Sequence, residues 1–199
     1  MPGHYIGGED TPMEEVTELN FDEDGECIGV RVVGARVAGT AYDRVRLVDV
    51  ELVRCDLAGC DFSEASLHRV KLVDCRGGGV DFGSATWHTV TATDCRFEEA
   101  NFRLTRLTQV HFEASNCGRA DFGGARLEDV KLPDCDLRAA DFSNAKCTQV
   151  DLRTARLDDL RGVGSLRGAT IGVDQLFGLA PGLATAAGMR VLTEDESIP

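Results

Sequence analysis

Large aromatic side chains are scarce in this chain: Phe, Trp and Tyr make up only 6% of the 199 residues, with a single Trp. A core of this size without many aromatic anchors has to be built from many small side chains. Hydrophobic residues still account for 43% of the chain, which argues against wholesale disorder. The composition therefore predicts one folded domain, or at most two small ones.

Basic residues are outnumbered, with 21 Lys and Arg against 34 Asp and Glu and a formal net charge of -13. A chain of this charge repels phosphates, which disfavours direct binding of nucleic acid. No stretch approaches the roughly 18 to 20 consecutive apolar residues of a membrane span, and the acidic N-terminal region lacks the profile of a signal peptide. We therefore expect a cytoplasmic protein without a membrane partner.

Motifs for catalysis and cofactor binding are also missing. The sequence has no GxxxxGK phosphate loop, no HExxH zinc motif and no GxSxG nucleophile elbow. The eight cysteines include no CxxC pair, and in a chain without an export signal we expect them to stay reduced. The sequence predicts no enzyme, no cofactor and no metal site.

A five-residue period organises most of the chain. From Gly25 to Gly162, the positions divisible by five and the positions two further on hold 28 residues each, and none is charged. The first column is small, with nine Ala, nine Val and five Cys; in the second, 18 of the 23 positions from Leu47 to Leu157 are Leu or Phe. Neither a helix nor a simple alternating strand produces this pattern.

A second, longer period is superimposed on the first, because an aromatic residue recurs at every fourth pentapeptide. Four pentapeptides therefore make one turn of a solenoid with four sides, in which neighbouring coils lie about 4.8 Å apart and like rings stack. Twenty-eight repeats predict seven coils and a rod roughly 34 Å long. The recurring residues are Tyr42, Phe62, Phe82, Phe102, Phe122 and Phe142.

These repeats resemble the pentapeptide-repeat family, whose pattern is a small residue, Asp or Asn, Leu or Phe, and two variable positions. The segments 60–64, 120–124 and 140–144 carry the pattern, and the match runs without a break from Gly25 to Gly162. The resemblance implies an all-β solenoid, a right-handed quadrilateral β-helix, with a short α-helical cap at the C-terminal end. In layout the chain is most similar to the mycobacterial MfpA type within this family.

The two ends do not follow the repeat, so we divide the chain into an acidic segment or cap (1–24), the repeat body (25–164) and a C-terminal segment (165–199). A solenoid exposes unpaired backbone at its ends and needs caps. Thr11 to Glu14 has capping-box spacing, which predicts a short helix from about Pro12 to Leu19; an unstructured acidic tail is the alternative.

After Leu160 the frame slips, and Leu166 to Ile171 looks like one more coil side, displaced. Helical spacing follows, interrupted by Pro181, and predicts helices at about 173–180 and 182–188 and an extended segment from Met189 to Leu192. Their apolar face exceeds what one coil end can cover, which suggests an end-to-end homodimer, as in the MfpA type. The expected dimerisation residues are Val173, Leu176, Phe177, Leu179, Ala180, Leu183, Ala184 and Ala187.

All eight cysteines fall in the two inward columns, where they are expected to act as small buried hydrophobic residues. His68 and His88 occupy equivalent outward positions on adjacent coils; a solvated pair is expected there, and a surface metal site is the alternative. Gly77 stands where a large residue belongs, which predicts a local thinning of the core. With a filled interior, function is expected to reside on the outer surface.

The resemblance also implies a function. Members of the Qnr and MfpA type protect or inhibit DNA gyrase and topoisomerase IV by resembling B-form DNA in size and charge. This implies a protein partner and an effect on quinolone or gyrase-poison sensitivity. A rod of roughly 34 Å matches one duplex turn of about 10 base pairs. The expected partner-binding residues form an acidic face on the Phe side: Asp61, Glu64, Asp81, Asp121 and Asp141.

Part of the charge pattern departs from this expectation. Residues 1–24 carry eight acids and no Lys or Arg, and the repeat body carries only -3. Arg46, Arg106, Arg126 and Lys146 stand where the family usually has Asp or Asn, and cations there repel a DNA-binding partner. Two other interpretations therefore stay open: a scaffold for a different protein, and an enzyme or metal protein that uses the histidine pair.

Overall fold

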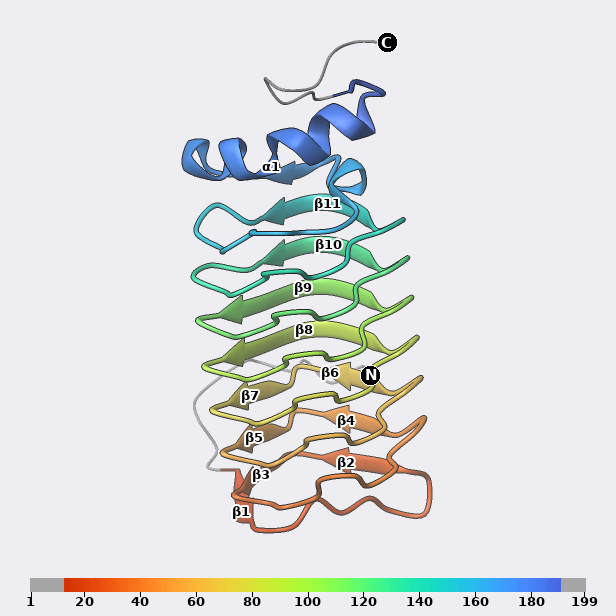
Figure 1. Ribbon diagram of the computed structural model, residues 1–199. Coiled ribbons are helices and arrows are strands. Elements are labelled where there is room, and N and C mark those ends of the chain that lie inside the picture. The colour runs from red at the N-terminus through yellow and green to blue at the C-terminus, as the bar shows by residue number, and fades with distance from the viewer. Residues whose placement is uncertain (1–12, 191–199) are drawn as a thin grey trace, which may run out of the picture.

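The computed structural model describes residues 13–190 and shows a β-solenoid of about eight turns, closed at its C-terminal end by one helix (Figure 1). Every strand pairing is parallel. The elements are β1 (Glu14–Val16), β2 (Glu26–Ile28), β3 (Val30–Val33), β4 (Arg46–Val48), β5 (Glu51–Val53), β6 (Ser66–His68), β7 (Lys71–Val73), β8 (Thr86–Thr93), β9 (Arg106–Glu113), β10 (Arg126–Lys131), β11 (Lys146–Asp151), a 3-10 helix (Val163–Ser165), β12 (Ala169–Thr170) and α1 (Val173–Ala186).

The predicted coil of four pentapeptides is confirmed by the strand register. On one side of the solenoid, Leu47 pairs with Leu67 and Leu67 with Trp87. On the next side, Val90 pairs with Val110. Because these partners are four pentapeptides apart, each pentapeptide occupies the same side of the column as the one a full coil away.

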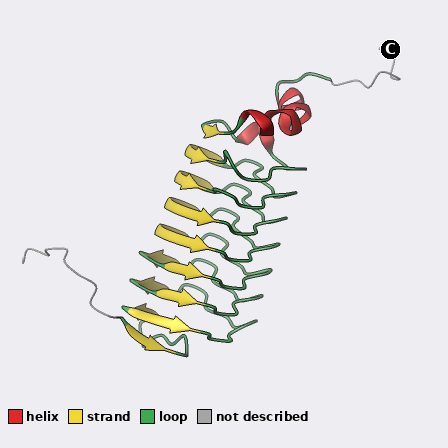
Figure 2. Cartoon of the chain, turned by 90° about the vertical axis from the view of Figure 1, so that its left-hand side faces the viewer, coloured by secondary structure: helices red, strands yellow, loops and turns green. Residues whose placement is uncertain are grey.

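The four sides are of two kinds. The sides of Leu47 and Leu52 are strands, and from β8 onward single strands run continuously around the corner between them. The sides of Leu57 and Phe62 are tight turns joined only by isolated bridges, with bonds such as Ala65 N–H to the Phe62 carbonyl at 3.1 Å. Figure 2 shows the strands along one face of the column and the loops along the opposite face.

The stack of aromatic rings is confirmed as the spine of the core. From Phe62 to Phe142 the centroids of successive rings lie 4.8 to 5.6 Å apart, with interplanar angles of 2° to 22°. At Gly77, where a thinner core was predicted, the ring of Phe97 fills the space, since a Cβ on the glycine would lie 2.8 Å from it. The interior is therefore filled along its length.

The N-terminal segment forms a strand, so the predicted helix from Pro12 to Leu19 is wrong. β1 pairs in parallel with β3, and this extends the solenoid before residue 25 and gives about eight turns instead of seven. Leu19 is buried at the coil end. The ring centroids of Phe21 and Tyr42 lie 5.2 Å apart, so Phe21 extends the stack of rings by one. Pairing with an open coil edge outweighs the local capping signal here.

The C-terminal segment begins as predicted, with a displaced coil side: in the pairing of β12 with β11, Ala169 lies opposite Val150, one position short of a full coil. One helix follows, so the prediction of two helices is wrong. Pro181 lies inside α1, which continues through it because Leu179 is buried before it and Gly182 packs on Val163 after it.

The extended segment predicted from Met189 to Leu192 lies only partly within the described residues. Met189 and Arg190 are neither helix nor strand, and the remainder lies outside the described residues. Among residues 13–190 no helix is long and apolar enough to cross a membrane.

Candidate interaction surface

The cysteines offer no reactive group, because all eight are free and buried. Burial raises the pKa of the Cys135 and Cys147 thiols to about 11. Thiols also donate to backbone carbonyls of the preceding coil, as from Cys75 Sγ to the Leu52 oxygen at 3.3 Å. The cysteines are therefore core residues, as predicted from their columns.

The histidine pair is a stacked surface feature. The rings of His68 and His88 lie 5.1 Å apart at an interplanar angle of 4°, and Arg69 contacts Nε2 of His68. Partial burial, together with the positive charge of Arg69, lowers the pKa of His68. Across residues 13–190, His, Cys, Asp and Glu side chains form no group of three that could hold a metal ion.

The predicted acidic face exists as a column on the Phe side. Parallel bridges join Asp61 to Asp81, Asp81 to Asn101, Asn101 to Asp121 and Asp121 to Asp141. Four carboxylates and one amide therefore lie in register, one per coil. Glu64, the fifth predicted residue, lies exposed at the next corner with φ 57°.

Each of these side chains also has a structural task. In every coil its Oδ1 accepts the backbone N–H of the residue two positions later, inside the turn, and so satisfies a donor that no strand neighbour reaches. The bonds are Ser63 N to Asp61 at 2.8 Å, Gly83 N to Asp81 at 2.6 Å, Arg103 N to Asn101 at 2.9 Å, Gly123 N to Asp121 at 2.7 Å and Ser143 N to Asp141 at 2.8 Å.

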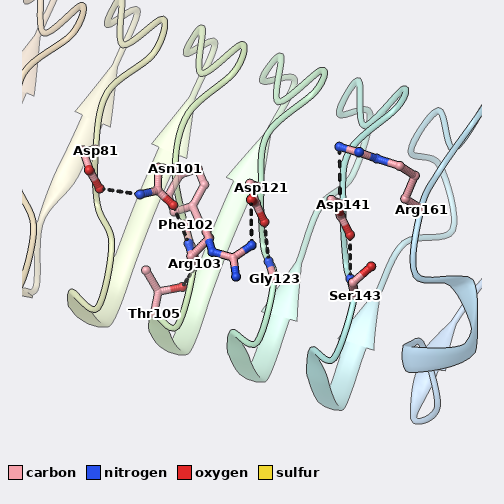
Figure 3. A network of polar contacts seen from close by, with 10 residues as sticks. All are labelled: Asp81, Asn101, Phe102, Arg103, Thr105, Asp121, Gly123, Asp141, Ser143 and Arg161. Atoms are coloured by element: carbon pink, nitrogen blue, oxygen red, sulfur yellow. Dashed lines mark hydrogen bonds and ion pairs between the residues drawn. The ribbon is translucent and has the colours of Figure 1, made fainter.

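Cations offset the charge in the C-terminal half of the column (Figure 3). Arg103 Nη1 donates to Asp121 Oδ2 at 3.1 Å, and Arg161 Nη2 lies 3.6 Å from Asp141 Oδ2. Hydrogen bonds from Ser143 and the charge of Arg161 lower the pKa of Asp141. Among the described residues Asp61 forms no ion pair, so the uncompensated negative charge lies towards the N-terminal end.

The two arginines were not predicted as part of this surface. Arg161 stands one full coil after Asp141, so the coil period alone could have revealed it. Arg103 reaches Asp121 from the turn position that follows Phe102, and the period does not single out this pair. Their effect is to halve the acidic face that the sequence predicts.

The predicted dimerisation residues divide into two groups on α1. Leu179 is buried against its own coil end, whereas Val173 and Phe177 are 78% and 80% exposed. A hollow of about 420 Å³ beside this contact is lined in part by Leu166 of the last coil and Leu183 of the helix. The other residues are exposed or half-buried: Leu176, Ala180, Ala184 and Ala187.

A residue that was not predicted anchors α1 as a cap. Gln175 Nε2 donates to the carbonyls of Leu152 and Ala155, both at 2.6 Å, and its Oε1 accepts the N–H of Gly172. The Leu152 carbonyl also accepts the Ala155 N–H, whereas the Ala155 carbonyl has no backbone donor among the described residues, and Gln175 supplies one. The helix is therefore held to the solenoid on one face and leaves its other face free.

Solved structures with a similar fold include three of interest. QnrB1, a plasmid-mediated fluoroquinolone resistance protein, is 16% identical over 90% of this chain and 97% of its own, with a TM-score of 0.48. HetL, involved in heterocyst differentiation regulation in the cyanobacterium Nostoc sp. strain PCC 7120, is 16% identical over 76% and 90%, with a TM-score of 0.34. A pentapeptide repeat protein of the Arabidopsis thaliana thylakoid lumen is 18% identical over 58% and 68%, with a TM-score of 0.21. At these identities the likeness concerns the fold alone.

Two family models match the chain. One, the pentapeptide repeat region, matches residues 85–161, and the other, pentapeptide repeats (8 copies), matches residues 43–76. A comparison with curated protein sequences finds no match. Together the two models cover more than half of the chain, and with the repeats described above they show that it belongs to the pentapeptide-repeat family.

Proposed function

We propose that this protein is a non-catalytic interaction module that binds a protein partner through its outer sides, and that the partner is DNA gyrase or topoisomerase IV. The observation that carries the first part is the filled interior, which leaves only the outer surface for recognition. The second part rests on the family resemblance and on the column of carboxylates on the Phe side.

The column supports a DNA-mimicking role through its regular spacing. From Asp61 to Asp141 the acids span four coils, about 19 Å, along a straight rod. A basic groove that normally receives phosphates attracts such a line of negative charge. Because Arg103 and Arg161 offset the far end, the proposal places the main contact at Asp61, Glu64 and Asp81.

A supercoiling assay with gyrase, run with and without a fluoroquinolone, tests this proposal. We expect micromolar wild-type protein to change supercoiling or drug-stabilised cleavage, and D61N/D81N to lose the effect. Asparagine keeps the turn acceptor, as Asn101 does in the native chain. The matched control is D74N/D94N, which removes the same charge from an exposed corner on another side and should stay active. Absence of any effect of the wild type contradicts the proposal.

The pairing of Arg103 with Asp121 and of Arg161 with Asp141 favours a second candidate, a scaffold for a partner other than a topoisomerase. A pulldown dominated by such a partner, and unchanged by D61N/D81N, would support this candidate. Loss of the partner in D61N/D81N would instead place it on the acidic column.

We further propose that the free face of α1 joins two copies end to end. An exposed Phe177 beside Val173 on a single helix is an apolar face that a second copy would cover. Sedimentation analysis should show a dimer for the wild type and a monomer for Phe177→Asp. Leu104→Asp, which places the same charge at a 60% exposed leucine on the side of the rod, should remain dimeric. A monomeric wild type would contradict the proposal.

A further inference from the structure

One column on the Leu47 side carries cations on three successive coils. Elsewhere on the strand sides and corners, opposite charges on adjacent coils form ion pairs: Glu26 with Arg46 at 2.7 Å, Glu51 with Lys71 at 2.9 Å and Glu99 with Arg119 at 2.8 Å. In the column that begins with Glu26 and Arg46, three later coils instead carry cations only. These are Arg106, Arg126 and Lys146, which we name the cation ladder.

The cation ladder lies in strict register on neighbouring strands. Arg126 in β10 pairs with Arg106 in β9 and with Lys146 in β11, so the three cations follow one another at about one strand spacing, 4.8 Å. All three side chains are exposed, and within residues 13–190 none forms an ion pair or a side-chain hydrogen bond. Like charges at this spacing repel each other, so an external anion would relieve an unfavourable interaction.

An exposed aliphatic side chain flanks the ladder. Leu104 is 60% exposed at the corner just before Arg106, with φ 58° in the left-handed region that leucine rarely adopts. Its side chain leans along the rod over Gly124, since a Cβ on that glycine would lie 2.8 Å from Leu104 Cδ2. The leucine therefore extends towards the coil that carries Arg126 and adds an apolar contact to the line of cations.

From this juxtaposition we infer that the cation ladder and Leu104 form a docking surface for an acidic segment of a partner protein that carries an aliphatic residue. Three rungs span about 10 Å, which an extended peptide of roughly four residues covers. Glu128 and Asp129 lie on the same side, beyond Leu127. Their carboxylates repel an acidic segment, so the partner segment has to run along the three cations and not across the strand.

A protein segment fits this surface better than single-stranded nucleic acid does. Proteins that bind single strands combine cations with aromatic side chains on which bases stack. The large exposed hydrophobic side chain beside the ladder is aliphatic, and the exposed Phe177 lies on α1 at the end of the rod. The rings of His68 and His88 lie on the same side in the two coils before Arg106, but they stack on each other. The inference does not depend on a topoisomerase as the partner, because it concerns a different side and the opposite charge.

Fluorescence anisotropy tests the inference with three labelled probes: a short glutamate peptide ending in leucine, the same peptide ending in serine, and an oligothymidylate of equal charge. The full-length protein should bind the leucine peptide most tightly. R106Q/R126Q/K146Q should weaken this binding about tenfold. Leu104→Ser should weaken binding of the leucine peptide and leave the serine peptide unchanged.

Arg46→Gln is the matched control, because Arg46 occupies the same column but is paired with Glu26. It should bind the probes like the wild type. Equal binding by wild type and triple variant would overturn the inference, and tighter binding of oligothymidylate than of the leucine peptide would assign the surface to nucleic acid instead.

A melting experiment at low salt separates binding from folding. Because the triple variant removes like-charge repulsion, its melting temperature should equal or exceed that of the wild type. A clear fall, or failure to fold, would show that the ladder serves the structure and would overturn the inference.

Discussion

Two columns of the solenoid hold the same position in the repeat, just before the large inward residue, and differ in almost every other respect. On the Phe side this position carries Asp61, Asp81, Asp121 and Asp141, whose carboxylates accept backbone N–H groups within tight turns. On the Leu47 side the cation ladder has no such bonds among the described residues. The first column therefore contributes hydrogen bonds to the fold, and the second column does not.

The backbone explains this difference. A turn side is joined to its neighbours by isolated bridges, so an N–H inside the turn has no strand partner, and on the Phe side Asp or Asn accepts it. The Leu47 side is joined by a continuous ladder of backbone bonds, as between β9 and β10, and the cations before its large inward residues make no such turn bonds. The acidic residues on the Phe side therefore stabilise the fold, whereas the unpaired charges of the cation ladder are available for binding.

The largest expected effect on the free energy of unfolding comes from the aromatic core beneath both columns. Phe102→Ala removes a ring that stacks on Phe82 and Phe122 and should lower the free energy of unfolding by about 3–5 kcal/mol. Urea denaturation measures this loss. The control is Ile28→Ala, at a side chain that is 53% exposed and distant from α1, and it should cost well under about 1 kcal/mol. Equal losses for the two variants would mean that Phe102 does not lie in a closed core.

Next in size is the structural role of the acidic column. Asp121→Ala leaves the Gly123 N–H without its acceptor and removes the partner of Arg103, so it should cost about 1–3 kcal/mol. Asp121→Asn keeps the acceptor and should cost less than half as much. If neither substitution lowered the free energy of unfolding in urea, the aspartate column would not stabilise the fold, and the contrast between the two sides would be wrong.

A smaller effect separates paired from unpaired cations. Arg46→Gln loses the ion pair with Glu26 and should cost about 0.2–1 kcal/mol, an amount that salt reduces. Arg126→Gln has no such pair to lose and should be neutral or slightly stabilising at low salt. Thermal melts at low and high salt test this ordering, which a destabilised Arg126→Gln would reverse.

The smallest effect is a dependence of stability on pH. Hydrogen bonds from Ser143 and the charge of Arg161 hold the pKa of Asp141 below its ordinary value. Its contribution to stability is therefore complete above the pKa of the unfolded chain and is lost as the pH falls through the lowered pKa of the folded state. Between about pH 5 and pH 2 the unfolding free energy of Asp141→Asn should fall less than that of the wild type, as followed by urea denaturation. An equal fall would exclude this carboxyl as a source of acid sensitivity.

The sequence predicts the body of the fold well because one physical cause acts at every coil. A side chain such as Phe82 stacks on identical neighbours, so period and geometry coincide. At the ends that redundancy is lost. The segment from Pro12 to Leu19 carries a helix signal but pairs as β1, and α1 runs through Pro181 because contacts on both sides of the proline hold it.

The candidate surface was predictable only in outline. The column from Asp61 to Asp141 follows from the period, but its turn bonds and its partner Arg103 depend on side-chain geometry that the period does not contain. Gln175 likewise acts through two carbonyls at the end of the last coil. The sequence therefore placed the charges of the candidate surface on a side of the column, and the structure showed which of these charges are paired.

Equilibrium unfolding of two full-column variants tests the central contrast most directly. One variant replaces Asp61, Asp81, Asp121 and Asp141 with alanine, and the other replaces the cation ladder with glutamine. We predict that the first loses several kcal/mol of unfolding free energy, at about 1–2 kcal/mol per turn, and that the second is at least as stable as the wild type at low salt. A stable alanine variant together with a destabilised glutamine variant would contradict the account.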